Sequence, residues 1–172
     1  MARIGFAGYA VGGLAVGEDE ATRSAMLEAS VAPLPPASPR YLMGVGRPQD
    51  LLEAVARGVD LFDCVLPTRN ARNGWAFSAE GPLHLRNARF REDARPLEAA
   101  CPCPACRRFS RAYLRHLFVV GEMLGPALVS LHNLSHLHRL MEGARTAIRQ
   151  GRFEVFRALH AGGQSDTTPA LT

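Results

Sequence analysis

Three cysteines and one histidine have the spacing of a structural metal site. Cys101, Cys103 and Cys106 lie in one short stretch, C-P-C-P-A-C, and His132 follows in a segment with helical periodicity. Thiolate sulfur and imidazole nitrogen are the ligands that zinc prefers, and four of them complete a tetrahedral site. His136 comes one helical turn after His132, so spacing alone leaves either histidine as the fourth ligand. We expect one structural zinc ion and no disulfide, because Cys101 and Cys103 are poorly placed to bridge and no secretory pattern precedes them.

Asp63 is a candidate for catalysis. It lies in the apolar run V-D-L-F-D-C-V-L-P, where strand alternation places it on the same face as Leu61 and Val65. A carboxylate among apolar residues is costly unless it has partners, and barrel enzymes place catalytic groups at the C-terminal ends of parallel strands. Asp63 is therefore either a catalytic group or a structural aspartate that caps the following loop.

Two further segments could contact an anionic or aromatic ligand. Thr68–Gly74 (T-R-N-A-R-N-G) carries Arg69 and Arg72, whose guanidinium groups suit phosphate oxygens and base edges, although a solvated turn explains the segment equally well. Gly12–Glu18 is rich in glycine, which lets backbone groups approach a flat ligand closely. It lacks the G-x-G-x-x-G and G-K-[ST] spacings of nucleotide-binding loops.

The charge of the chain is compatible with an RNA partner. The 172 residues carry a formal net charge of +4, and all 20 basic residues are arginine. Codon usage in a GC-rich genome explains the absence of lysine, but a basic chain also suits an anionic partner. No apolar stretch is long enough for a membrane span, so we expect a cytoplasmic protein.

The first part of the chain alternates strands and helices. The pattern predicts strands over Gly8–Leu14, Tyr41–Val45 and Val59–Leu66, with helices over Asp19–Val31 and Pro48–Arg57 between them. This order is typical of parallel βα units. Three such units do not make a closed barrel, which takes about 250 residues, so we expect part of a larger architecture.

The rest of the chain has a different pattern. Short strand-like pieces lie around Gly81 and Pro82, and four helices are predicted over Ser110–Phe118, Glu122–Leu140, Glu142–Gln150 and Phe153–Leu159. An apolar stripe at three- and four-residue spacing is predicted to face the core; it comprises Leu124, Leu128, Leu131, Leu134, Leu137 and Met141.

Together these motifs resemble the tRNA-guanine transglycosylases, specifically the bacterial type. The matching stretches are G-Y-A-V-G-G-L-A-V-G-E (Gly8–Glu18), R-Y-L-M-G-V-G (Arg40–Gly46), D-L-F-D-C-V-L-P-T-R-N-A-R-N-G (Asp60–Gly74), C-P-C-P-A-C-R-R-F-S-R-A-Y-L-R-H-L (Cys101–Leu117), H-N-L (His132–Leu134) and G-R-F (Gly151–Phe153). The resemblance implies a (β/α)₈ barrel with an inserted zinc-binding subdomain and C-terminal helices. It implies the exchange of guanine at the tRNA wobble position for 7-aminomethyl-7-deazaguanine, in queuosine biosynthesis.

The resemblance also assigns roles to single residues. Asp63 matches the nucleophile, which attacks the ribose and forms a covalent aspartyl-ribose intermediate. The residues that match contacts to the base are Gly13, Leu14, Val16, Tyr41 and Met43. Arg69 and Arg72 match the loop that reads the bases flanking the target. The zinc ligands match Cys101, Cys103, Cys106 and His132, and Phe109, Tyr113 and His116 match the segment that forms a homodimer interface.

The resemblance implies that this chain corresponds to about the last three βα units of the family's barrel. On this basis residues 1–75 form the last βα units with the base pocket and the nucleophile, 76–160 form the zinc-binding subdomain with the C-terminal helices, and 161–172 form a disordered tail. The alternative to an enzyme is a catalytically incomplete, zinc-stabilised fragment that only binds RNA or a partner.

Overall fold

The computed structural model describes residues 2–14 and 17–161, so Val16 and residues 162–172 of the predicted tail lie outside the described residues. The predicted start of that tail is wrong, because Ala161 is helical. The chain divides into two compact units, Met1–Leu66 and Pro67–Thr172. Within the described residues, none of the helices is both long enough and apolar enough to cross a membrane.

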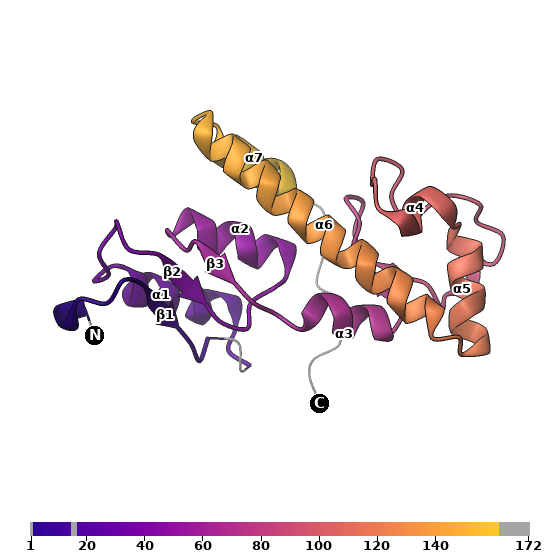
Figure 1. The fold of residues 1–172 in the computed structure, drawn as a ribbon, viewed down its shortest axis with the longest axis horizontal. Helices are drawn as coiled ribbons and strands as arrows, with labels where there is room; N and C mark the ends of the chain where they lie inside the picture. The colour runs from indigo at the N-terminus through magenta and orange to yellow at the C-terminus, as the bar shows by residue number, and fades with distance from the viewer. Residues whose placement is uncertain (1, 15–16, 162–172) are drawn as a thin grey trace. The chain divides into compact units, whose positions relative to one another are not determined.

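The first unit is a parallel sheet with a helix in each crossover (Figure 1). Its strands β1 (Tyr9–Val11), β2 (Arg40–Leu42) and β3 (Leu61–Phe62) pair in the order β1-β2-β3, and a 3₁₀ turn, η1 (Ala2–Ile4), precedes them. Helix α1 (Glu20–Val31) connects β1 to β2, and α2 (Pro48–Ala56) connects β2 to β3. Both pairings are parallel, as the sequence pattern predicts, although each strand is shorter than expected.

Local chemistry explains the two helices of the first unit. The Asp19 carboxylate accepts a hydrogen bond from the Thr22 amide and so caps α1, and Pro48 begins α2, where its missing N–H costs nothing. The apolar faces of both helices pack with the strands in one core, whose buried residues are Val11, Leu14, Leu27, Val31, Leu42, Val45, Ala54 and Val59.

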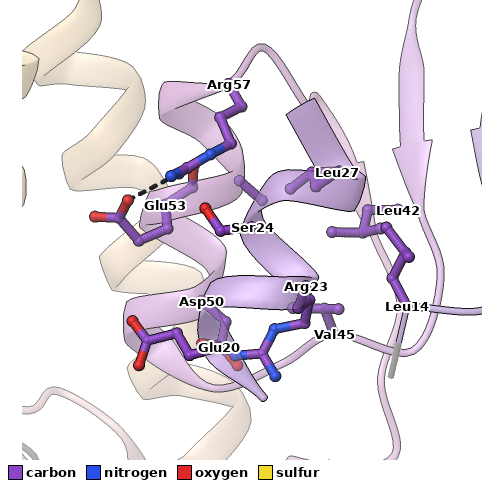
Figure 2. Close-up of a pocket in the computed structure, with 11 residues that line it drawn as sticks. Leu14, Glu20, Arg23, Ser24, Leu27, Leu42, Val45, Asp50, Glu53 and Arg57 are labelled. Carbon is purple, nitrogen blue, oxygen red and sulfur yellow. Dashed lines mark hydrogen bonds and ion pairs between the residues drawn. The ribbon is translucent and has the colours of Figure 1, made fainter. Parts of the chain in front are cut away.

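Ion pairs line a small cavity between α1 and α2 (Figure 2). Arg23 of α1 contacts Asp50 of α2 at 2.9 Å, and Arg57, which directly follows α2, contacts Glu53 at 2.8 Å. The cavity has a volume of about 70 Å³. Burial raises the pKa of Asp50 even though the Arg23 guanidinium opposes that shift, so this carboxylate depends on its arginine to remain charged.

The second unit is a helical assembly with one short hairpin. Strands β4 (Trp75–Ala76) and β5 (Leu83–His84) pair antiparallel around Gly81, as predicted. The helices are α3 (Leu66–Arg72), which begins one residue before this unit, η2 (Ala88–Phe90), α4 (Pro104–Arg108), α5 (Arg111–Val120), α6 (Leu124–Arg149) and α7 (Phe153–Ala161). Helices α4, α5 and α7 all pack against α6 (Figure 1).

Two predictions for this unit are wrong. The segments Glu122–Leu140 and Glu142–Gln150 form one continuous helix, α6, because no residue near Met141 breaks helical geometry. The segment after Asp63 is helical from Leu66, because Pro67 fits the first turn of a helix as well as it ends a strand.

The apolar stripe predicted on α6 is only partly correct: Leu128 packs against the core, but three other members do not. Leu124, Leu131 and Leu134 are each more than 40% exposed. The buried face is formed instead by Gly125, Val129, His132, Asn133, Leu140, Ala144 and Ala147. Because this buried face contains two polar residues and several small ones, hydrophobic periodicity assigned three exposed leucines to the core.

Candidate active site and metal centre

Asp63 directly follows β3 and is held by two donors from the β2 segment. The Tyr41 hydroxyl donates to Oδ1 of Asp63 at 2.6 Å, and the Gly44 amide donates to the same oxygen at 3.2 Å. The Tyr41 hydrogen bond is the main cause that lowers the pKa of the Asp63 carboxyl, and the Gly44 amide adds to it. The carboxylate is exposed and charged at neutral pH. Neither donor contacts Oδ2, so these two hydrogen bonds do not prevent Oδ2 from contacting a ligand.

The predicted base-contact residues also follow the parallel strands. Gly13 comes two residues after β1, and Met43 comes directly after β2, while Tyr41 lies within β2. Because these strands are parallel, their C-terminal ends lie at one edge of the sheet, where Asp63 also lies. Gly13 has a left-handed backbone (φ 79°), which a side chain would strain.

Leu14 differs from the other base-contact candidates. Its side chain is 3% exposed and packs in the core of the first unit, so only its backbone is available to a ligand. Met43 is 43% exposed, and its amide donates to the Val11 carbonyl at 3.0 Å, which fixes the backbone of this strand end.

The glycines after β2 were not predicted as site residues, yet they position Asp63. Gly44 has a left-handed backbone (φ 77°) and supplies the amide that contacts the carboxylate. A side chain at Gly46 would overlap Cβ of Cys64, the residue after Asp63. The G-x-G spacing at the end of the predicted strand Tyr41–Val45 was the sequence signal for this close approach.

Arg69 and Arg72 lie on α3, in the second unit. The predicted loop is in fact helical here, and residues three apart share one helix face, so the two exposed guanidinium groups point to the same side. Such a pair suits the regular spacing of phosphates or the edges of stacked bases.

The four predicted metal ligands come together in the second unit. Nδ1 of His132 lies 3.7 Å from the sulfur atoms of Cys101 and Cys103, and 3.2 Å from that of Cys106. All four ligand atoms lie within 4.8 Å of one another. Ligands at the usual zinc distances around a tetrahedron place sulfur and nitrogen roughly 3.6 Å apart, so the group has the dimensions of a Cys₃His metal site.

Hydrogen bonding fixes His132 as a ligand. Its Nε2 lies 2.7 Å from the carbonyl oxygen of Phe77, to which it donates, so the proton is on Nε2 and the lone pair of Nδ1 faces the cysteines. Burial lowers the pKa of His132, which keeps the imidazole neutral. Burial also raises the pKa of the Cys106 thiol, so a thiolate there requires a cation beside it.

The structure selects between the two histidines. His136 is not among the clustered ligands; its Nδ1 lies 3.5 Å from the Glu98 carboxylate instead. The adjacent His136 ring and the hydrogen bond from Arg139 lower the pKa of Glu98 to about 2, although burial opposes the shift.

Asn133, the middle residue of the H-N-L motif, is a central structural residue. Its Oδ1 accepts from the Phe77 amide at 2.9 Å, and its Nδ2 donates to the carbonyls of Pro67 and Trp75 at 2.9 and 3.0 Å. Because Phe77 also accepts from His132, consecutive residues of α6 hold the β4 segment against the metal centre.

Comparisons with known proteins identify the family of this chain. A family model described as Queuine tRNA-ribosyltransferase matches residues 1–163. Relatives named queuine tRNA-ribosyltransferase include those from Thermus thermophilus (60% identical over 90% of this chain), Novosphingobium aromaticivorans (58% over 90%) and Nitrosomonas europaea (54% over 94%). The chain spans only 40–44% of the length of these relatives. The resemblance drawn from the motifs is confirmed: the chain belongs to the queuine tRNA-ribosyltransferase family, the tRNA-guanine transglycosylases.

Proposed function

We propose that this chain is the C-terminal part of a tRNA-guanine transglycosylase whose nucleophile is Asp63. The first unit then supplies about the last three βα units of a (β/α)₈ barrel. The observation that carries the proposal is the exposed, ionised Asp63 carboxylate at the C-terminal edge of a parallel sheet, the edge where barrel enzymes bind substrates.

The reaction follows the double displacement of retaining glycosidases. A carboxylate oxygen of Asp63 attacks C1′ of the ribose, and the glycosidic bond breaks, so guanine leaves with the bonding electrons and takes up a proton. The incoming 7-aminomethyl-7-deazaguanine loses a proton and attacks C1′ from the opposite face, which breaks the aspartyl ester and restores the carboxylate. The target nucleotide must first leave its stack to reach Asp63.

The Tyr41 hydroxyl and the Gly44 amide prepare this carboxylate. Both bind Oδ1, so they fix the orientation of the group, keep it charged and leave Oδ2 for attack. The base binds at the same edge, against the backbone of Gly13 and Leu14 and beside Met43. Val16, outside the described residues, completes this pocket.

RNA binding involves the second unit as well. Arg69 and Arg72, exposed on one face of α3, contact the nucleotides that flank the target. Substrate tRNA and the reaction are cytoplasmic.

Zinc, held by Cys101, Cys103, Cys106 and His132, supplies structure rather than chemistry, because four protein ligands leave no position for a substrate.

Two copies of the enzyme associate through the zinc subdomain. The rings of Phe109 and Tyr113 stack at 5.1 Å with Tyr113 39% exposed, and His116, also exposed, follows one turn later on α5.

A chimera tests the enzymatic proposal. This chain is joined to the part of the Thermus thermophilus relative that it does not match, and incorporation of radiolabelled guanine into tRNA is measured. The chimera should exchange guanine, and Asp63→Asn should lose on the order of 10⁴-fold or more of that rate. Asp60→Asn is the matched control, because Asp60 lies at the other end of β3 and contacts the Arg40 amide. Exchange by the Asp63→Asn chimera at the control rate would contradict the assignment.

The second candidate is the non-catalytic fragment, and the observation behind it is the chain's short span relative to its relatives. It predicts that the isolated chain binds tRNA in a salt-sensitive manner without base exchange, and guanine exchange by this chain alone would exclude it. Metal analysis addresses the zinc proposal separately: the chain should contain one zinc ion, and Cys103→Ala should lose it together with helical content. A metal-free, fully helical chain would contradict the zinc site.

A further inference from the structure

A network of charged and titratable side chains, in which Glu98 and His136 are largely buried and Arg139 is 38% exposed, lies outside the four metal ligands. Arg139 Nη1 donates to Oε2 of Glu98 at 2.8 Å, and His136 Nδ1 lies 3.5 Å from the same oxygen. The other carboxylate oxygen, Oε1, accepts a hydrogen bond from the Ala79 amide at 3.2 Å. The Glu98 side chain is only 10% exposed, and a carboxylate buried to that extent requires such partners.

Two of these residues, Glu98 and Arg139, also lie close to the metal ligand Cys101. The Cys101 amide donates to the Glu98 carbonyl at 3.2 Å, so the acidic residue and the first ligand share one turn. Through its ion pair with Glu98, the Arg139 guanidinium is held near Cys101, with whose sulfur it interacts electrostatically. Three thiolates carry one more negative charge than a divalent ion neutralises, so a cation next to one of those sulfurs is favourable.

We propose that Arg139 is a positioning residue of the metal centre and that Glu98 holds it there. The Arg139 guanidinium balances the excess negative charge on the Cys101 thiolate. The Glu98 carboxylate orients this guanidinium, and Glu98 also joins the Ala79 segment to the turn that carries the cysteines. The inference rests on the proposed function only through the zinc ion. Partners that orient metal ligands typically change metal affinity by about 10–100-fold.

The test uses the full 172-residue chain loaded with zinc. Zinc affinity and release rate are measured by competition with a chromogenic chelator. Arg139→Met should bind zinc at least about 10-fold more weakly and release it faster, and Arg139→Lys, which keeps the charge but loses the planar fork, should lie between it and the wild type. Arg145→Met is the matched control, because Arg145 is on the same helix in an exposed ion pair with Glu142, and its affinity should not change.

Cobalt(II) in place of zinc separates charge balance from general destabilisation. Removing a cation beside a thiolate raises the energy of the sulfur lone pairs, so the sulfur-to-cobalt charge-transfer band of Arg139→Met should move to lower energy than in the control. If Arg139→Met does not fold, Glu98→Gln should give the same direction of change, because it removes the anion that holds the guanidinium. Wild-type zinc affinity with an unshifted cobalt band in the folded variant would overturn this inference alone. A wild-type chain that binds no zinc would overturn the proposed zinc site itself.

Discussion

Replacement of Asn133 by alanine should destabilise the second unit strongly. The side chain is fully buried and makes three hydrogen bonds, to the Phe77 amide and to the carbonyls of Pro67 and Trp75. A carbonyl can find another donor more easily than a buried amide can find another acceptor, so the Phe77 N–H dominates the cost at about 1–3 kcal/mol. The cavity left by the amide adds about 1 kcal/mol, for a total loss of about 2–4 kcal/mol in the free energy of unfolding.

Urea unfolding followed by tryptophan fluorescence measures this loss. The chain has a single tryptophan, Trp75, which lies in the same unit and contacts Asn133 directly. With a urea slope of about 1–2 kcal/mol/M, the midpoint should fall by about 1 M or more. Asn73→Ala is the control: Asn73 is exposed and donates one long hydrogen bond of 3.3 Å to Arg69, so it should change stability by less than about 0.5 kcal/mol. Equal midpoints for the two variants would refute the reasoning.

Three further predictions concern the candidate active site. Tyr41→Phe removes the donor that most stabilises the charged form of Asp63, so the pKa of Asp63 measured by NMR titration should rise toward its ordinary value. An unchanged pKa would show that the hydrogen bond from Tyr41 does not lower the pKa of Asp63. Arg69→Ala and Arg72→Ala should each weaken tRNA binding and reduce the slope of log affinity against log salt by about 0.7–0.9, whereas an unchanged slope would exclude phosphate contacts at these positions. Gly46→Ala should lower the free energy of unfolding by about 1–3 kcal/mol, because its Cβ would overlap that of Cys64. Gly12→Ala is the control and should cost less, because its Cβ meets only Met43 Sδ, at 3.4 Å. Equal losses for the two variants would contradict the close approach of Gly46 to Cys64.

The sequence predicted the features that depend on local chemistry. Parallel βα order followed from periodicity and glycine positions, and the three cysteines were identified by spacing alone. The fourth ligand was not, because His132 and His136 are one turn apart. The difference between them is a tertiary contact: His132 donates to the Phe77 carbonyl, and His136 meets Glu98.

Two of the failures, the buried face of α6 and the contact between Tyr41 and Asp63, share one physical cause. The buried face of α6 contains His132 and Asn133, whose polar groups are satisfied by backbone partners 55–66 residues away in sequence. Hydrophobic periodicity cannot recognise a polar residue as buried when its hydrogen-bond partners come from a distant segment, so it assigned the leucines to the core. The contact between Tyr41 and Asp63 escaped prediction for the same reason, because strand register determines it.

The central claim, that Asp63 is the nucleophile, is tested most directly by isolating the covalent intermediate. The chimera is incubated with substrate tRNA without the incoming base, denatured and digested, and the ribonucleotide-bearing peptide is identified by mass spectrometry. We predict a denaturation-resistant adduct on Asp63, lost in Asp63→Asn and retained in Asp60→Asn. An adduct on another residue, or an adduct that persists in Asp63→Asn, would contradict the account.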